Sequence, residues 1–146
     1  MAGPSSVLFA CSFNSVRSPI AEAILKQLHR QRIFVDSVGV RSEPVDPFAV
    51  AAMAEIGIDL AGHRSKTFDD LEDTSFDLIV TLTPEAHHRA LEMTRTMAVD
   101  VEYWPTADPT AIEGSREAML EAYRSVRDDL WDKISARFRA LPTPAP

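Results

Sequence analysis

Short apolar runs alternate with longer amphipathic stretches along the 146-residue chain. Four short runs, rich in valine, leucine, isoleucine and phenylalanine, predict strands at positions 6–10, 33–38, 76–82 and 99–104. Four stretches with apolar residues every three or four positions predict helices at 19–28, 46–56, 84–93 and 114–141. Because strands and helices alternate, the pattern predicts an α/β fold: a parallel sheet with helices on both faces and right-handed crossovers.

Proline and glycine mark several of the predicted boundaries. Ser18 is placed to cap the first helix and Pro19 to begin it, because the first helical position tolerates the fixed φ of proline. Thr83 and Pro84 give the same signal for the third helix, and Gly57 is placed to end the second. The polar stretch 63–75 has little periodicity, so we expect an extended connection there with one short helical turn at 68–71.

Length and composition favour one domain. With 45% hydrophobic residues, the chain is long enough for one core and short for two, so we expect a single domain over 1–146 with a flexible tail at 142–146. It contains neither an apolar stretch long enough for a membrane helix nor a signal-peptide pattern, which makes the cytoplasm the default location. The net charge of −7 argues against nucleic acid or an anionic membrane as partners.

The chain has a single cysteine, Cys11, which stands at the end of the first apolar run. One cysteine excludes an intramolecular disulfide and a cysteine-rich zinc site, and a free thiol suits a reducing compartment. The sheet prediction puts Cys11 at the carboxyl end of a strand, where ligands of such sheets bind. A loop then leads to Arg17 and to a helix N-terminus, whose N–H groups and dipole favour a phosphate-like anion. The same positive field favours a nucleophilic thiolate, although a lone cysteine is more often a small core residue.

The segment VLFACSFNSVRSPIAEAI, residues 7–24, carries the Cys-x5-Arg-Ser signature of protein tyrosine phosphatases. With its cysteine loop close to the amino terminus, it resembles the opening of the low-molecular-weight members. The resemblance continues through DSVGV at 36–40, the helix segment at 46–59, FDLIVTL at 76–82 and WPTADP at 104–109. It implies a three-layer α/β domain with a four-stranded parallel sheet in the order 2-1-3-4 and a phosphate-binding loop after strand 1.

The resemblance also implies roles for individual residues. Cys11 would attack phosphorus, Arg17 would bind the phosphate oxygens, and Asp108 would be the general acid and base. Asn14 would hold the loop in shape, and Ser18 would place a hydroxyl beside the cysteine. The remaining loop residues are expected to line the phosphate site: Ser12, Phe13, Ser15 and Val16. Neither a metal nor another cofactor is expected, because backbone amides and the arginine neutralise the phosphate charge.

Two departures from the family pattern leave the substrate open. Phe13 stands where many members have glycine, and Thr110-Ala111 follows Pro109 where many relatives have aromatic residues. The expected partner is therefore a phosphorylated protein, with phosphotyrosine favoured, or a small phosphate ester. Two alternatives remain: an arsenate reductase that uses an external thiol, since the chain has no second cysteine for a disulfide relay, and a phosphate-binding module without turnover.

Overall fold

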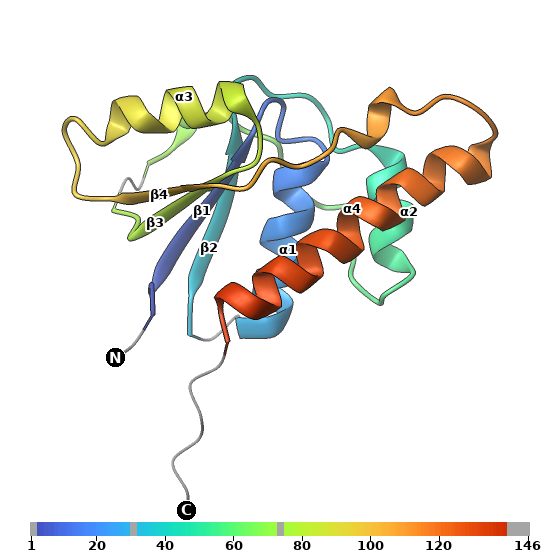
Figure 1. Cartoon of the computed structure of the whole chain (residues 1–146), viewed down its shortest axis with the longest axis horizontal. Coiled ribbons are helices and arrows are strands. Elements are labelled where there is room, and N and C mark those ends of the chain that lie inside the picture. Colours follow the sequence, from blue (N-terminus) through green and yellow to red (C-terminus); the bar gives the residue numbers. More distant parts are fainter. Residues whose placement is uncertain (1–2, 30–31, 73–74, 140–146) are drawn as a thin grey trace, which may run out of the picture.

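The computed structural model describes residues 3–29, 32–72 and 75–139. Four parallel strands form one sheet in the order β2-β1-β3-β4, as expected (Figure 1). The strands are β1 (Ser6–Cys11), β2 (Phe34–Gly39), β3 (Leu78–Thr81) and β4 (Asp100–Tyr103). The helices are α1 (Arg17–His29), α2 (Pro47–Ala54), α3 (Pro84–Met93) and α4 (Arg116–Arg137), with short 3-10 turns at η1 (Phe68–Asp70) and η2 (Pro109–Ala111).

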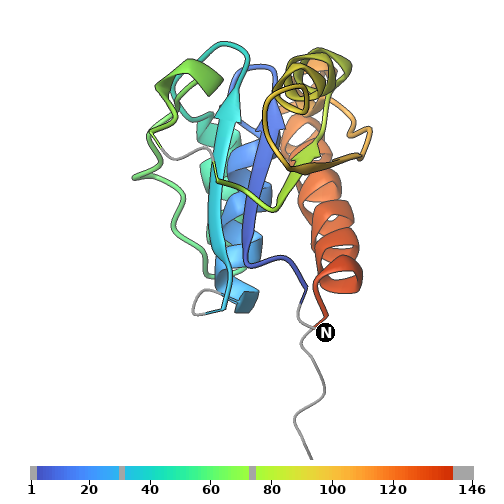
Figure 2. The same cartoon turned by 90° about the vertical axis from the view of Figure 1, so that its left-hand side faces the viewer.

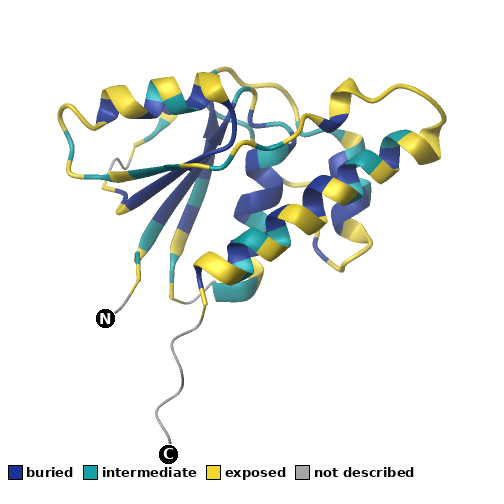
Figure 3. Cartoon of the chain, in the orientation of Figure 1, coloured by how far each residue is buried: buried dark blue, intermediate teal, exposed yellow. Residues whose placement is uncertain are grey.

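Each face of the sheet is covered by its own helices, which confirms the three-layer prediction. Alternate residues of β1 point to opposite faces, so Val7 and Phe9 pack against α1, α2 and α4, while Leu8 and Ala10 pack against α3 and the η1 segment. Figure 3 shows β1 and the first half of α1 mostly buried, whereas α3 and α4 alternate between buried and exposed positions. None of the described helices is long and apolar enough to cross a membrane.

Most observed helix and strand boundaries lie within two residues of the positions predicted from local sequence signals. Asp46 and Thr83 cap α2 and α3, each ahead of a proline, and Gly57 follows α2 with a φ of 78°. The predicted short turn at 68–71 is found as η1. The sheet strands at 76–82 and 99–104 are shorter than predicted, at Leu78–Thr81 and Asp100–Tyr103.

The prediction that Ser18 caps the first helix is wrong. Helix α1 begins at Arg17, and its first turn closes when the N–H of Ile20 donates to the carbonyl of Val16 at 3.1 Å. Pro19 therefore lies inside the first turn, where its missing N–H still costs no helical hydrogen bond. The Ser18 side chain is buried and bonded to Cys11 instead of to the helix backbone.

The last helix is shorter than the predicted 114–141. Gly114 has a φ of 134°, which is not helical, and Ser115 caps the helix by accepting from the N–H of Ala118 at 3.1 Å. The helix ends at Arg137, because Phe138 leaves helical geometry and is buried against Trp104, with ring centroids 6.4 Å apart. The tail predicted to be flexible, 142–146, lies outside the described residues.

The carboxyl ends of β1 and β2 lie side by side at one edge of the sheet (Figure 2), and the loop after Cys11 packs against Gly39 there. A Cβ atom on Gly39 would lie 2.3 Å from the carbonyl oxygen of Arg41 and 2.6 Å from the backbone nitrogen of Asn14. Backbone atoms on both sides leave no room for a side chain. Glycine at position 39 therefore sets how closely the loop approaches β2.

We expect Gly39→Ala to lower the free energy of unfolding by at least about 2 kcal/mol, because backbone atoms must move to admit the methyl group. Chemical denaturation measures the change. Gly62→Ala is the matched control, since nothing lies within 4 Å of a Cβ atom at that position. Equal stability of the two variants would contradict the close approach.

Candidate active site

The loop of residues 12–16 is held from behind by the chain that follows β2. The carbonyl oxygens of Cys11, Ser12, Phe13 and Ser15 accept from the N–H groups of Val40, Arg41, Glu43 and Asp46, at 3.1, 2.8, 3.0 and 3.0 Å. The carbonyl between them, that of Asn14, accepts from the Ser65 hydroxyl at 2.7 Å. Every loop carbonyl from position 11 to 15 is thus turned away from the loop's open side.

The N–H groups of the loop face the opposite way. In a trans peptide the N–H points opposite to the preceding carbonyl, so the N–H groups of residues 12–16 converge on the open side. Within the described part of the chain, none of them donates to a protein acceptor. Together with the N-terminus of α1, they form a concave set of donors that suits an oxyanion.

Asn14 gives the loop its shape. It is fully buried and has a φ of 52°, the left-handed region that asparagine tolerates better than most residues. Its Oδ1 accepts from the backbone N–H of Lys66 at 3.0 Å, and this donor fixes which way the amide faces. Its Nδ2 therefore donates to the hydroxyls of Ser18 at 2.8 Å and Ser37 at 2.9 Å.

The hydroxyl of Ser18 lies 2.9 Å from the sulfur of Cys11. Because the Ser18 oxygen already accepts from Asn14, its own proton is free for Cys11 or for the carbonyl of Val38 at 3.3 Å. The shorter contact favours the sulfur. Cys11 is buried, so the Ser18 hydroxyl donates to its sulfur in a site shielded from water.

The hydrogen bond from Asn14 to Ser37 leads on to a buried carboxylate, that of Glu22. Ser37 donates to Oε1 of Glu22 at 2.5 Å, and Lys26 forms an ion pair with Oε2 one helical turn along α1. Sequence reasoning did not identify Glu22, Ser37 or Ser65. Each is polar and buried or half-buried near the loop, but their positions along the chain carry no motif.

His63 completes the contacts of Asn14. Its Nε2 lies 3.1 Å from Oδ1 of Asn14, which accepts and so requires the proton on Nε2. Burial lowers the pKa of the His63 imidazole below its usual value, although the charge of Glu22 acts in the opposite direction. The neutral ring is therefore the form that the folded structure favours.

Arg17 connects the loop to the segment after β4. Its Nη1 donates to the carbonyl oxygen of Thr106 at 3.0 Å. A guanidinium has five N–H groups, so the remaining donors are available to an anion. Asp108 lies two residues beyond Thr106, and this bond brings its segment to the side of the loop.

Asp108 is exposed and caps η2. Its Oδ1 accepts from the backbone N–H of Thr110 at 3.0 Å and from the Thr110 hydroxyl at 2.6 Å. These bonds to Oδ1 fix the rotation of the carboxyl group. Within the described part of the chain, Oδ2 has no hydrogen-bond partner, so this oxygen is available to a ligand.

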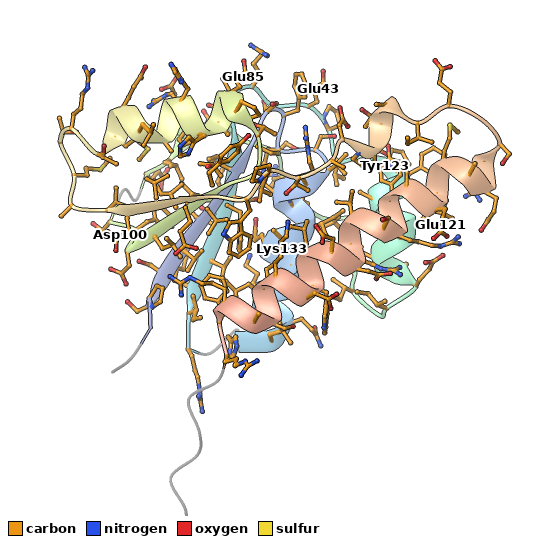
Figure 4. All side chains as sticks on the ribbon, viewed as in Figure 1. Glu43, Glu85, Asp100, Glu121, Tyr123 and Lys133 are labelled. Atoms are coloured by element: carbon orange, nitrogen blue, oxygen red, sulfur yellow. The ribbon has the colours of Figure 1, made fainter. Side chains whose placement is uncertain are left out.

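The other loop side chains contact different parts of the structure. Phe13 is 37% exposed at the rim, and the guanidinium of Arg41 covers its ring at 5.4 Å from the centroid. Arg41 is held by both carboxylate oxygens of Glu85 at 3.2 and 2.9 Å; Glu85 is labelled at the start of α3 in Figure 4. Ser12 contacts the Thr83 hydroxyl at 3.3 Å. Two residues anchor the loop's far end: Ser15, which donates to the Pro44 carbonyl, and Val16, which is buried.

No group of three or more histidine, cysteine, aspartate or glutamate side chains gathers at metal-binding distance within residues 3–29, 32–72 and 75–139.

The parallel sheet and the cysteine loop at its carboxyl edge define the class: α/β proteins that hold a phosphate-like anion on backbone amides. The chain belongs to the low molecular weight phosphotyrosine protein phosphatase family, whose model matches residues 6–141.

Similar proteins within this fold carry out different reactions. An arsenate reductase from Bacillus subtilis is 33% identical over 128 residues, which cover 88% of this chain and 91% of that protein. A solved arsenate reductase in the phosphate-binding state is 29% identical with a TM-score of 0.72, over 92% of this chain and 96% of the other. A YwlE arginine phosphatase mutant with a phosphorylated active-site serine is 25% identical with a TM-score of 0.73, over 91% of both chains.

We expect acid to destabilise the protein partly through His63. Because its folded pKa is lowered, the unfolded chain binds more protons below about pH 6.5, and stability falls as pH decreases through that range. His63→Gln keeps an N–H donor for Asn14 but does not titrate. The difference in unfolding free energy between pH 7.5 and 5.5 should therefore shrink in this variant.

Urea denaturation at the two pH values measures this difference. His88→Gln on α3 is the control, because His88 is exposed. An unchanged pH dependence in His63→Gln would show that the His63 ring does not carry the effect.

Proposed function

We propose that the protein is a cysteine-dependent phosphatase that hydrolyses phosphate monoesters, with protein phosphotyrosine as the favoured substrate. The phosphate would lie on the N–H groups of residues 12–16, with Arg17 across two of its oxygens. In this proposal Cys11 is the nucleophile and Asp108 the proton donor. The phosphate-bound relative and the relative with a phosphorylated serine support an oxyanion at this loop and a transfer of phosphate to the nucleophile position.

The observation that carries the proposal is that Cys11 is the only cysteine of the 146 residues. Reduction of arsenate to arsenite takes two electrons, which a single thiol supplies only together with a second thiol. Hydrolysis of a phosphate ester needs only water as the second reactant. The chain therefore holds a complete set of groups for hydrolysis and an incomplete set for reduction. A reducing compartment such as the cytoplasm would keep the free thiol active.

In the first step, the thiolate of Cys11 attacks phosphorus and forms an S–P bond as the P–O bond to the leaving group breaks. The hydroxyl of Ser18, 2.9 Å from the sulfur, stabilises the thiolate before attack. Arg17 and the loop amides neutralise the charge on the three equatorial oxygens. Asp108 transfers its proton to the leaving oxygen, which departs as an alcohol or phenol.

In the second step, water replaces the leaving group. Asp108, now a carboxylate, takes a proton from that water as its oxygen attacks phosphorus and the S–P bond breaks. Inorganic phosphate and the Cys11 thiolate are the products. The bonds from Thr110 to Oδ1 of Asp108 hold the carboxyl group in place for both transfers.

Arsenate reduction by an external thiol is the second candidate. The 33% identical arsenate reductase supports it, because the same loop geometry suits arsenate and phosphate. A phosphate-binding module without turnover is the third candidate, and the presence of both Cys11 and Asp108 disfavours it, since binding alone requires neither.

Assays of arsenate reduction with glutathione or mycothiol and a matching redoxin should give rates that are negligible beside the rate of phosphate ester hydrolysis. The reverse order of the two rates would favour the reductase.

We expect the purified protein to hydrolyse para-nitrophenyl phosphate in the presence of EDTA, and Cys11→Ser to reduce kcat by at least about 1,000-fold. A serine hydroxyl at this position is far less ionised than a thiol and attacks phosphorus poorly. Release of nitrophenolate between pH 5 and 7.5 measures both. Retained activity in Cys11→Ser, or an inactive wild-type protein, would refute the proposed hydrolase.

We expect Asp108→Asn to discriminate between leaving groups. For phenyl phosphate, whose leaving group needs a proton, kcat should fall by about 100-fold or more, and for para-nitrophenyl phosphate much less. Steady-state kinetics on both esters give the ratio. Thr110→Val, which removes the hydroxyl bond to Asp108 but keeps the backbone bond, should show a smaller effect in the same direction. An equal loss for both esters in Asp108→Asn would exclude Asp108 as the acid.

A further inference from the structure

A groove runs along α1, between this helix, β2 and the segment that follows α2. It consists of two adjoining hollows of about 520 and 170 Å³, which share Ala23, Lys26 and Asp59 in their lining. Helix α1 leads from the cysteine loop toward the amino ends of the strands (Figure 1), so the smaller hollow, beside His63, lies near the loop, and the larger, beside Phe34, lies toward the start of β2. The larger hollow alone has the volume of a small-molecule site, roughly 300–1,000 Å³.

The smaller hollow is lined by Glu22 and His63, the two side chains that stand behind the cysteine loop. Glu22 is only 8% exposed, and its carboxylate accepts from Ser37, which in turn accepts from Asn14. His63 donates from Nε2 to Oδ1 of Asn14, so Nδ1 of the neutral ring is a hydrogen-bond acceptor. Among the described residues, Nδ1 of His63 has no partner. A ligand in this hollow therefore meets the residues that hold Asn14.

The charge of the smaller hollow favours a cation. Two carboxylates, those of Glu22 and Asp59, lie with one ammonium, that of Lys26, which is already ion-paired with Glu22. Burial lowers the pKa of His63 and keeps its ring neutral. Oδ1 of Asp59 accepts from the N–H of Ala61 at 2.9 Å, and Oδ2 has no partner in the described part of the chain. A second cation thus finds a free carboxylate oxygen, whereas an anion meets net negative charge.

The larger hollow offers apolar surface for the rest of a ligand. Its apolar lining comes from three directions: Ala23 on α1, Val35 on the edge strand β2, and Ile58 after α2. Val35 and Ile58 also belong to the core, which holds their side chains in place. An apolar group that covers them gains free energy by leaving water. Because the hollows share Ala23, a cationic head in the smaller and an apolar body in the larger fit a single molecule.

A donor in the smaller hollow acts on the loop through the tautomer of His63. A hydrogen bond to Nδ1 requires the ring proton on Nε2, which is the nitrogen that donates to Asn14. Asn14 turns the loop with its φ of 52° and orients the Ser18 hydroxyl toward Cys11. A ligand that fixes this tautomer stabilises the loop in its anion-binding shape. By linkage, an anion in the loop strengthens the binding of that ligand equally.

We propose that this groove is a second binding site, which takes an organic cation with an apolar body and, when occupied, strengthens oxyanion binding in the loop. The ligand class is an ammonium or guanidinium compound with an alkyl or aryl group. Its head would lie between Asp59 and His63, and its body against Val35 and Ile58. The groove reaches the loop from the side of the Asn14 side chain, whereas the loop N–H groups face the open side, so both sites can be filled together. The inference needs anion binding in the loop but not ester hydrolysis.

The first test compares three probes with the same body and different charge: phenylbutylamine, phenylbutanol and phenylbutyrate. At about pH 7.5 the amine is a cation and the acid an anion. Titrations followed by amide chemical shifts give each Kd and map each probe. The Kd of the amine should be at least about fivefold lower than that of the alcohol, and the carboxylate should bind most weakly. Equal Kd values for the amine and the alcohol, or shifts confined to residues outside the groove, would overturn the proposal.

Variants of two aspartates show whether the groove carries this preference. Asp59→Asn removes the charge but keeps Oδ1 for the N–H of Ala61, so the Kd values of the amine and the alcohol should become equal within about twofold. Asp100→Asn is the matched control, because Asp100, labelled in Figure 4, is exposed on β4 at the other edge of the sheet and does not line the groove. The same amine Kd in both variants would contradict the site.

The second test measures the coupling to the loop. Calorimetry with inorganic phosphate on the wild-type protein should give a Kd at least about threefold lower when phenylbutylamine saturates the groove. Methylamine at the same concentration controls for charge alone and should have no effect. His63→Gln lacks the Nδ1 acceptor, so in this variant phenylbutylamine should no longer change the phosphate Kd. An unchanged phosphate Kd in the wild-type protein with the amine bound would overturn the coupling.

These measurements are independent of the phosphatase proposal. If para-nitrophenyl phosphate is not hydrolysed but the amine and phosphate strengthen each other's binding, the phosphatase proposal fails and the groove assignment stands. If the ester is hydrolysed and the amine does not bind in the groove, only the groove assignment fails.

Discussion

The orientation of one side-chain amide, that of Asn14, is the constraint on which the rest of the site depends. A backbone N–H from Lys66 fixes its oxygen, so its nitrogen faces two hydroxyls. One of these, Ser18, is thereby oriented toward the sulfur of Cys11, and the other, Ser37, toward Glu22. The same residue adopts the left-handed backbone conformation that turns the loop. Loop shape and the environment of the sulfur therefore depend on a single buried residue.

This arrangement explains why one fold accommodates relatives named for different reactions. The loop presents backbone N–H groups and a guanidinium, which respond to the size and charge of a tetrahedral oxyanion and not to its central atom. What separates hydrolysis from reduction is the source of electrons and of protons outside the loop. In the proposed mechanism, the single cysteine limits the supply of electrons, and Asp108, in the segment held by the bond from Arg17 to Thr106, would supply the proton.

Sequence patterns predicted the features that depend on near neighbours. Strands, proline-led helix starts and the loop after the first strand follow from local periodicity and from residues within a few positions of one another. The partners of Asn14 could not be predicted in this way, because His63, Ser65 and Lys66 lie in a polar connection without periodicity and meet the loop only after the sheet forms. Ser18 shows the same limit. A serine before proline predicts a helix cap, whereas the hydrogen bond between Ser18 and Cys11 forms only once the loop has packed.

The hydrogen bonds that hold the loop carbonyls have a consequence for how the chain tolerates change. The donors are backbone groups of residues 40, 41, 43 and 46, and they meet carbonyls 11, 12, 13 and 15 in the same order along the chain. A backbone donor is lost only to proline, so the loop constrains the composition of 41–44 mainly at positions 41 and 43, which need an N–H, and through the contact of Arg41 with Phe13. The length of this segment is constrained more tightly. One inserted or deleted residue would shift every later donor past its acceptor, so insertions and deletions should be rare in this segment even where substitutions are common.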